Sequence, residues 1–251
     1  MAKSPNRADQ AYVALKRAII DQALKPGEKL PEDEVGALFS MSRTLVRQVF
    51  GKLSSDGLIK IGGKRPATVV TPSLDDAVAT FQVRRALERE VIRLVAGRWN
   101  PQFKSVLANH LTKEVAAAGE GEQTKSIRLA GEFHILLAEL SGNAILFRYV
   151  SEIVTRCSLV LAVFGRPHSA ECGVLEHTEI IHALEAGDVA AASRLMDHHI
   201  GEVENRALIS SVQSEQPTLA KKLELYTNVE EGGSKTTKNS KGGLRIVGSG
   251  T

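Results

Sequence analysis

Every stretch of this 251-residue sequence that could form a β-strand lies before the breaker Thr71-Pro72-Ser73. Two short runs, residues 58–61 and 67–70, are β-like, and they flank the glycine-rich basic segment GGKRP. Beyond the breaker, apolar residues recur at helical spacing to about residue 210. The sequence therefore predicts a mainly α protein, in which a small mixed N-terminal domain precedes an all-helical antiparallel bundle.

The first domain, residues 1–71, contains three predicted helices ahead of the two strands. Apolar residues at helical spacing predict a helix over about 9–22, and a second is expected over about 32–39. Ser42 is a suitable N-cap for a third helix over 43–55, which Asp56-Gly57 ends. Three helices followed by a two-stranded hairpin is the order of a winged helix-turn-helix.

The third helix and the hairpin carry the side chains expected to contact DNA. Arg43 and Arg47 are four residues apart, so both project from one side near the N-terminus of the third helix. An arginine there can form two hydrogen bonds to the O6/N7 edge of guanine. Residues 1–70 carry 12 Lys and Arg against 7 Asp and Glu, whereas residues 71–212 carry 14 against 18. The candidate DNA-contacting residues are Ser42, Arg43, Thr44, Arg47, Lys64 and Arg65.

The stretch LKPGEKLPEDEVGALFSMSRTLVRQVFGKLSSDGLIKI resembles the winged helix of the GntR superfamily of transcriptional regulators. The resemblance spans about residues 10–70 and implies that this domain binds an operator. Two positions depart from the family pattern. Leu45 stands where a proline is common, which a helix accommodates easily. Pro66 replaces the usual glycine at the tip of the wing, so the wing's DNA contact need not follow the family.

Six helices are expected in the second domain, residues 74–212. Their approximate ranges are 74–98, 101–118, 123–141, 143–165, 171–186 and 188–210. Residues 213–251 are polar and rich in Gly, Ser, Thr and Lys, and this composition predicts a disordered tail.

Three of these helices each place one histidine on the apolar inner stripe: His134, His177 and His199. One buried histidine is ordinary, but three on inner faces are better explained by a metal that imidazole nitrogens bind. His110 could lie partly inward on its helix, but the sequence indicates no partner for it, and His168, His182 and His198 have loop, polar or off-face positions. A surface or packing role is expected for these four histidines.

The same region resembles the FCD effector domain of the FadR-type branch of the superfamily. The motifs are VRRALERE, EFHILLAELSGN, EHTEIIHALEAGDVAAA and LMDHHI. The resemblance implies a divalent metal bound by these three histidines and by an aspartate one turn before the first of them. That aspartate position is Ala130 here. Three histidines still suffice for Zn²⁺ at reduced affinity; alternatively, the site has lost its metal and the histidines bind the effector directly.

Two arginines are candidates for effector binding. Arg84 occupies a position that the family tends to keep, where it could pair with a carboxylate effector or form an ion pair between helices. Arg156 is expected to face either the pocket or a partner subunit.

The resulting functional hypothesis is a homodimeric regulator that binds a palindromic operator and senses a small organic acid. The resemblance implies repression that the effector relieves. One alternative is a constitutive DNA-binding protein whose helical domain only dimerises. A three-histidine metalloenzyme is disfavoured, because the sequence has no H-E-x-x-H motif and no inward general base beside the histidines.

A cytoplasmic location is expected. No signal peptide is evident, and no apolar run approaches the roughly 18 residues of a membrane span. Cys157 and Cys172 have neither zinc-type nor disulfide-framework spacing.

Overall fold

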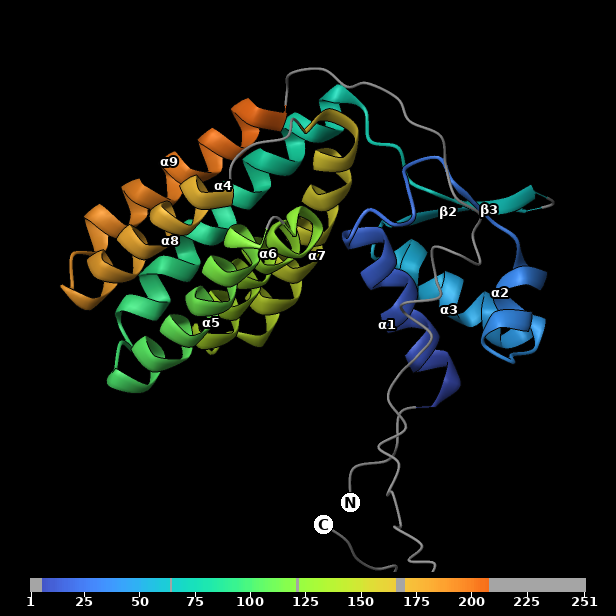
Figure 1. Ribbon diagram of the computed structural model, residues 1–251, viewed down its shortest axis with the longest axis horizontal. Coiled ribbons are helices and arrows are strands. Elements are labelled where there is room, and N and C mark those ends of the chain that lie inside the picture. Colours follow the sequence, from blue (N-terminus) through green and yellow to red (C-terminus); the bar gives the residue numbers. More distant parts are fainter. Residues whose placement is uncertain (1–5, 64, 121, 166–169, 208–251) are drawn as a thin grey trace, which may run out of the picture.

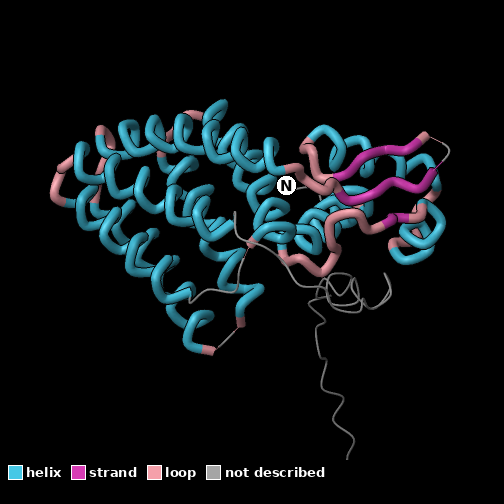
Figure 2. The backbone as a smooth tube through the Cα atoms, turned by 90° about the horizontal axis from the view of Figure 1, so that it is seen from above, coloured by secondary structure: helices cyan, strands magenta, loops and turns pink. Residues whose placement is uncertain are grey.

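The computed structural model describes residues 6–63, 65–120, 122–165 and 170–207. Within them, a small N-terminal unit with a sheet lies at one end of a bundle of long helices (Figure 1). All strands of the described chain belong to that N-terminal unit (Figure 2). The mainly α architecture that the sequence predicts is therefore confirmed.

The N-terminal unit follows the order of a winged helix-turn-helix. Its elements are α1 (Arg7–Ile20), β1 (Lys29–Leu30), α2 (Glu32–Leu38), α3 (Arg43–Ser55), β2 (Ile59–Gly62) and β3 (Arg65–Val69). The predicted bounds of α3 are correct, and its N-cap is Ser42, whose hydroxyl accepts a hydrogen bond from the Leu45 amide. Leu15, Phe50 and Leu53 are fully buried in the core of this unit.

Over the described residues, the sheet has three antiparallel strands in the order β1-β3-β2, so the prediction of only two strands was wrong. The missing strand is β1, in which Lys29 pairs with Thr68 and Leu30 pairs with Ala67. A two-residue strand shows no alternation, and the preceding Pro26-Gly27 signals only a turn. Pro66 lies within β3, beside a register irregularity between Lys60 and Gly62 of β2.

In the residues that the structure describes, the second unit contains six long helices. They are α4 (Leu74–Ala96), α5 (Pro101–Gly119), α6 (Gln123–Leu140), α7 (Ala144–Phe164), α8 (Ala170–Glu185) and α9 (Val189–Ala207). Ser73 forms a capping box with Asp76 at the start of α4, and Asn100 and Asn143 cap α5 and α7 through their side chains. The sequence predicts these helices to within a few residues at each end. The predicted tail, residues 213–251, lies outside the described residues.

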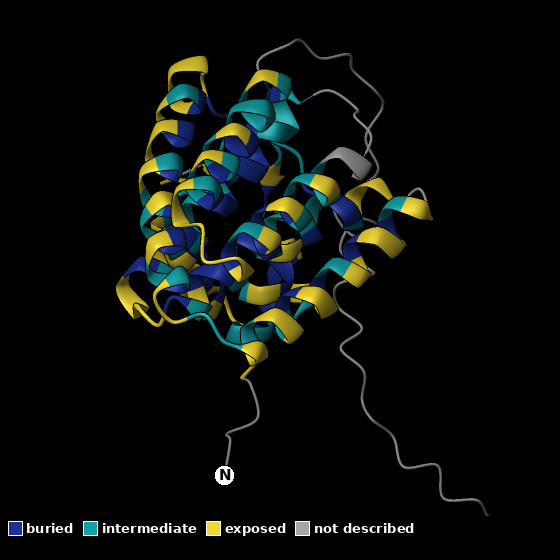
Figure 3. Ribbon diagram, turned by 90° about the vertical axis from the view of Figure 1, so that its left-hand side faces the viewer, coloured by how far each residue is buried: buried dark blue, intermediate teal, exposed yellow. Residues whose placement is uncertain are grey.

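The bundle has its own apolar core, around which α4 packs against α7 and α9 while α6 packs against α5 and α7. The inner faces of these helices are buried and the outer faces exposed (Figure 3). Among the described helices, none combines the length and apolar character needed to cross a lipid bilayer.

Contacts between described residues join the two units, chiefly where α1 meets α6 and α7. Leu159 of α7 is buried in the core of the N-terminal unit. Arg128 of α6 pairs with Asp21, the C-cap of α1, across 3.4 Å. Side chains of the bundle therefore contact the end of α1 directly.

Candidate functional site

The three inward histidines meet inside the bundle. His134 comes from α6, His177 from α8 and His199 from α9, and all three are buried. The Nε2 atom of His199 lies 3.2 Å from that of His134 and 3.4 Å from that of His177. In the described part of the chain, this trio forms the one group of three or more metal-ligating side chains in mutual reach.

Each of these histidines is oriented by a different glutamate. The Nδ1 atom of His134 is hydrogen-bonded to Glu88. The Nδ1 atom of His177 bonds to Glu114 at 2.8 Å, and that of His199 bonds to Glu176 at 2.5 Å. A carboxylate behind a metal-ligating histidine is the usual arrangement that fixes its ring and tautomer.

One ring nitrogen from each of the three histidines lies within 4.8 Å of the other two. Burial lowers the pKa of His134 and of His199 far below the usual histidine value, so both rings are neutral at pH 7. With the Nδ1–H group donating a hydrogen bond to a glutamate, the Nε2 atom of His134 and that of His199 each carry a bare lone pair. These lone pairs repel one another unless an electrophile lies between them.

The spacing of these nitrogens fits a metal ion. Zn–N bonds of about 2.0–2.1 Å in a tetrahedron place the nitrogens about 3.3–3.4 Å apart. The two Nε2 separations on His199, 3.2 and 3.4 Å, are close to that value. The donor set also suits Zn²⁺, which binds neutral imidazole through tetrahedral sites.

Sequence reasoning missed the supporting carboxylates, although Glu88 lies in the VRRALERE motif and Glu176 directly precedes His177. It also assigned no partner to His110, whose Nε2 lies 2.9 Å from the Leu129 carbonyl oxygen and 3.1 Å from Glu114. A signal was present, since Glu88 and Glu114 are acidic residues on the inner faces of their helices.

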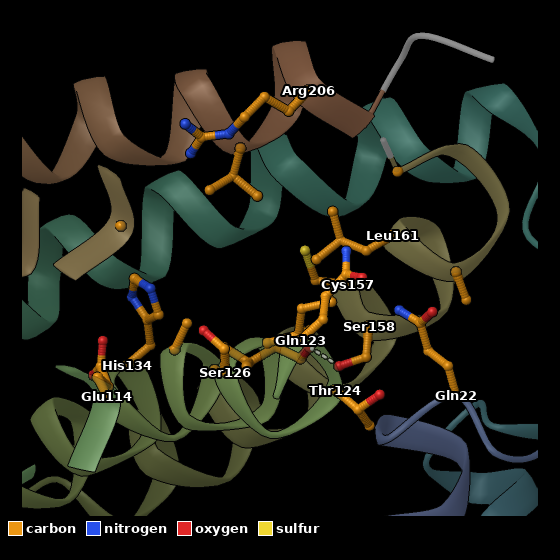
Figure 4. A pocket seen from close by; sticks show the side chains of 18 of the residues that line it. Gln22, Glu114, Gln123, Thr124, Ser126, His134, Cys157, Ser158, Leu161 and Arg206 are labelled. Atoms are coloured by element: carbon orange, nitrogen blue, oxygen red, sulfur yellow. Dashed lines mark hydrogen bonds between the residues drawn. The ribbon is translucent and has the colours of Figure 1, made fainter. Parts of the chain in front are cut away.

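A cavity of about 280 Å³ opens beside the histidines, with His134 and His199 in its wall. Figure 4 shows His134 on α6 and Arg206 on α9, the helix that faces it across the cavity. Ala130, the position of the expected aspartate, also lines this cavity. The rest of the wall is mixed, with the polar side chains Gln22, Gln123, Thr124, Ser126 and Ser158 beside apolar ones such as Leu161 and Val203.

Two arginines contribute to the cavity wall. Arg84 is buried, donates to Glu88 at 2.6 Å and lies 3.4 Å from the Cys157 sulfur. Its ion-pair partner is therefore on its own helix, not on a neighbouring one as the alternative reading expected. Arg206, which the sequence did not single out, pairs loosely with Glu176 at 3.7 Å. Its Nε atom is buried and makes no hydrogen bond.

Arg156 does not reach this cavity. Its guanidinium bonds to Glu152 at 2.9 Å, one turn earlier on α7, and closely approaches Gly57 of the N-terminal unit. It lines a different cleft, which lies between the wing, α4 and α7. The helical position of Arg156 directs it towards the first domain, so the structure does not group it with the histidines.

The candidate DNA-contacting residues that the structure describes are exposed at the start of α3 and on β3. Arg43 forms two hydrogen bonds to Asp33, and Arg47 bonds to Glu32 at 3.0 Å, so both are paired with carboxylates of α2. The arginine side chains remain about 70% exposed. Ser42 and Thr44 are exposed beside them, and Arg65 is exposed on β3; Lys64 lies outside the described residues.

Of the other histidines, His182 and His198 are exposed, as expected from their polar faces. His168 lies outside the described residues, as does the side chain of Cys172.

Two family models match the chain in succession. The model described as bacterial regulatory proteins, gntR family, matches residues 7–69. The model of the FCD domain matches residues 79–202. Their boundaries follow the division between the winged unit and the helical bundle.

Relatives match most of this chain and most of their own length. The HTH-type transcriptional regulator YdhC of Bacillus subtilis is 27% identical over 74% of this chain and 84% of its own length. The HTH-type transcriptional repressor RspR of Escherichia coli is 27% identical over 77% of this chain and 86% of its own. The solved structure of E. coli McbR/YncC has the same fold, with a TM-score of 0.72 at 21% identity, over 79% of this chain and 95% of that one.

Proposed function

The chain belongs to the GntR family of bacterial regulatory proteins and carries an FCD domain, and we propose that it is a metal-dependent, effector-responsive repressor. Regulators of this type bind DNA, and relatives such as RspR are named repressors. The proposal concerns the finer points: a homodimer on a palindromic operator, a divalent metal, and a small organic acid as effector. The convergence of three histidine Nε2 atoms, each backed by a glutamate, carries it.

The winged unit would read DNA through the N-terminal half of α3. Its Arg43 and Arg47 would exchange their carboxylate partners on α2 for guanine edges in the major groove. Exposed ion pairs contribute little stability, so releasing them costs little. Arg65 of β3 would contact the backbone or minor groove beside the wing.

A homodimer is supported by an apolar surface on α4 and α7. Val83 and Tyr149 are large apolar or aromatic side chains that are nearly half exposed, and Leu87 and Ile153 lie beside them in the cleft near the wing. An exposed apolar surface of this kind is typical of a protein interface. A second subunit, related by a twofold axis, would cover this surface. The dimer would then present one α3 helix to each half of a palindromic operator.

The metal would be held by His134, His177 and His199, with the fourth position open. When bound, it supplies a Lewis-acidic centre that attracts an anionic ligand atom. Ala130 leaves this part of the cavity wall without the carboxylate that would otherwise occupy it. A carboxylate from the effector can therefore complete the coordination, and the lack of a carboxylate at position 130 removes one negative charge that would repel it.

Arginine side chains support an acid as the ligand. Arg206 has a buried Nε atom free of hydrogen bonds, and its ion pair with Glu176 is long. A carboxylate ligand would satisfy this guanidinium. Arg84, in contrast, is already paired with Glu88, so its main role would be to hold that glutamate against His134.

Operator binding tests the proposal directly. An operator would first be selected from random duplex DNA, and binding would be followed by fluorescence anisotropy with zinc-loaded protein while a panel of organic acids is added. We expect at least one acid to weaken operator binding, and the effect to disappear after metal removal. Operator affinity indifferent to metal and to all acids would instead support a constitutive DNA-binding protein.

A further inference from the structure

The effector cavity is not enclosed by the helical bundle alone. Gln22, in the turn that follows α1 of the winged unit, is one of its lining residues. Figure 4 shows the Gln22 side chain extending from the end of α1 towards the side of the cavity where Ser158 lies. The DNA-binding unit thus contributes a polar side chain to the wall of a cavity that also contains two of the three histidines.

The backbone of Gln22 has a conformation that favours glycine. Its φ angle is 56°, in the left-handed region, and it occupies the position directly after the C-cap of α1. Glycines with positive φ stand at the corresponding ends of α3, α6 and α8, namely Gly57, Gly142 and Gly187. Ser40, after the C-cap of α2, is a second non-glycine residue with positive φ, but it does not line the cavity. The side chain of Gln22 is therefore distinguished by its place in the cavity wall, and it occupies that place at a cost in backbone strain.

Gln22 is also held in place independently of any ligand. Its neighbour Asp21 pairs with Arg128 of α6 at 3.4 Å, and Arg128 bonds to Glu132 at 2.6 Å. The same helix carries His134 and Ser126 in the cavity wall. The turn is therefore tethered to the helix that would bind the metal.

We propose that Gln22 binds the end of the effector that is remote from the metal, so that one ligand contacts both the metal centre and the DNA-binding unit. This inference rests on the proposed function and assigns a ligand class to the same cavity. Gln123, Thr124 and Ser158 line the cavity together with Gln22. Carboxamides and hydroxyls both donate and accept hydrogen bonds, which matches the hydroxyl groups of a hydroxy acid.

A direct contact of this kind couples the two sites thermodynamically. A ligand that contacts both units binds more tightly when the units are docked in the arrangement seen here than in another arrangement. It therefore stabilises this arrangement by the difference between the two binding free energies. DNA, which binds the winged unit in its own preferred arrangement, must alter the effector's affinity by the same factor. Gln22 would carry part of that coupling.

The test uses full-length zinc-loaded protein and two six-carbon probes, D-gluconate and hexanoate, with affinities measured by calorimetric titration. The variant is Gln22→Gly, which removes the side chain and relieves the positive φ. The matched control is Ser40→Gly, because Ser40 also follows a helix C-cap, has a φ of 50° and lies away from the cavity. Thermal melting of both variants reports on folding.

We expect D-gluconate to bind the wild type more tightly than hexanoate does. Gln22→Gly should weaken D-gluconate binding about fivefold, the effect of losing one neutral hydrogen bond, and should leave hexanoate binding unchanged. Ser40→Gly should bind both acids as the wild type does. Neither variant should melt below the wild type, since glycine adopts this backbone without strain.

Equal D-gluconate affinity in Gln22→Gly and wild type would overturn the inference and leave metal-dependent acid sensing intact. Lower melting of Gln22→Gly alone would also overturn it, because the side chain would then serve folding. Tighter binding of hexanoate than of D-gluconate would contradict the hydroxy-acid class. Binding of neither acid would count against the proposed function itself, and with it against this inference.

Discussion

His134 and His199 face each other with their Nε2 atoms 3.2 Å apart, while the Nδ1 atom of each is bonded to a glutamate. Both rings thus turn their lone pairs inward and their N–H groups outward. His177 repeats the pattern with Glu114. Three histidines from three helices are each oriented by a glutamate so that their Nε2 atoms face one another. A histidine cluster with a purely structural role would not require this orientation.

Removal of one histidine should abolish tight zinc binding. His177→Ala leaves two ligands, so zinc at 100 times the wild-type dissociation constant should no longer add its roughly 2.7 kcal/mol of stability. Calorimetric melting with and without zinc measures this. His198→Ala, one position before His199 but exposed, is the control and should behave as wild type. A zinc-dependent rise in melting temperature that persists in His177→Ala would contradict the site.

The glutamates behind the histidines should tune metal affinity without touching the metal. Glu114→Gln retains the shape of the side chain but weakens the acceptor for His177, and a loss of about 10–100-fold in zinc affinity is expected. A competition titration against a chromophoric chelator gives the value. Glu179→Gln, on the exposed face of α8, should have no effect. Equal losses in both variants would show that the Glu114 change acts through general electrostatics.

Restoring a carboxylate at position 130 should strengthen metal binding. Ala130→Asp adds a ligand and a negative charge one turn before His134, and zinc affinity should rise by roughly tenfold or more, about 1.4 kcal/mol. The same change should weaken binding of acidic effectors, which would lose both the open position and the favourable charge. Ala130→Asn is the neutral control. An Asp variant no tighter than the Asn variant would show that the side chain cannot reach the metal.

The arginines of α3 should control operator affinity. Arg43→Ala or Arg47→Ala is expected to cost about 1–3 kcal/mol in operator binding, as the loss of a base contact does. Asp33→Asn should instead strengthen binding to unrelated DNA, because it frees Arg43 from its carboxylate partner. Fluorescence anisotropy at a fixed salt concentration gives the DNA affinity of each variant. Arg93→Ala, an exposed arginine of α4, serves as the control, and unchanged affinity in both α3 variants would contradict the assignment.

The apolar surface on α4 and α7 should hold the dimer together. Tyr149→Asp introduces a charge into that surface and should shift the protein from dimer to monomer in sedimentation-velocity runs. Val115→Asp tests an apolar side chain on α5 that is somewhat more exposed than Tyr149, and this variant should remain dimeric. If the two variants sediment alike, the dimer interface lies elsewhere.

Sequence patterns predicted the helices well because each carries an amphipathic period and clear caps. Ser42 and Asn143, for example, cap their helices through side-chain hydrogen bonds. The two-residue strand β1 escaped, because two residues have no period and its pairing with β3 is set by tertiary structure. Local sequence patterns therefore predict helices, whose signals lie within the helix itself. They do not predict a short strand whose formation depends on a partner strand that is distant in sequence.

The sequence predicted the histidines of the candidate site but not the residues that surround them. The inward histidines follow from helical spacing, but their convergence depends on how three helices pack. Glu88 and Glu114 were missed because an inward glutamate has no meaning until its partner is known. Gln22 could not be assigned, since it lies in another domain and reaches the cavity through the tertiary packing of α1 against the bundle.

X-ray absorption at the zinc edge tests the central claim most directly. In the zinc-loaded protein, we predict one zinc per chain with three imidazole nitrogens at about 2.0–2.1 Å and one further light ligand. Imidazole scattering should fall when His199→Ala is measured. A spectrum without imidazole scattering, or zinc that washes away from the wild-type protein, would contradict the metal centre and the effector site built around it.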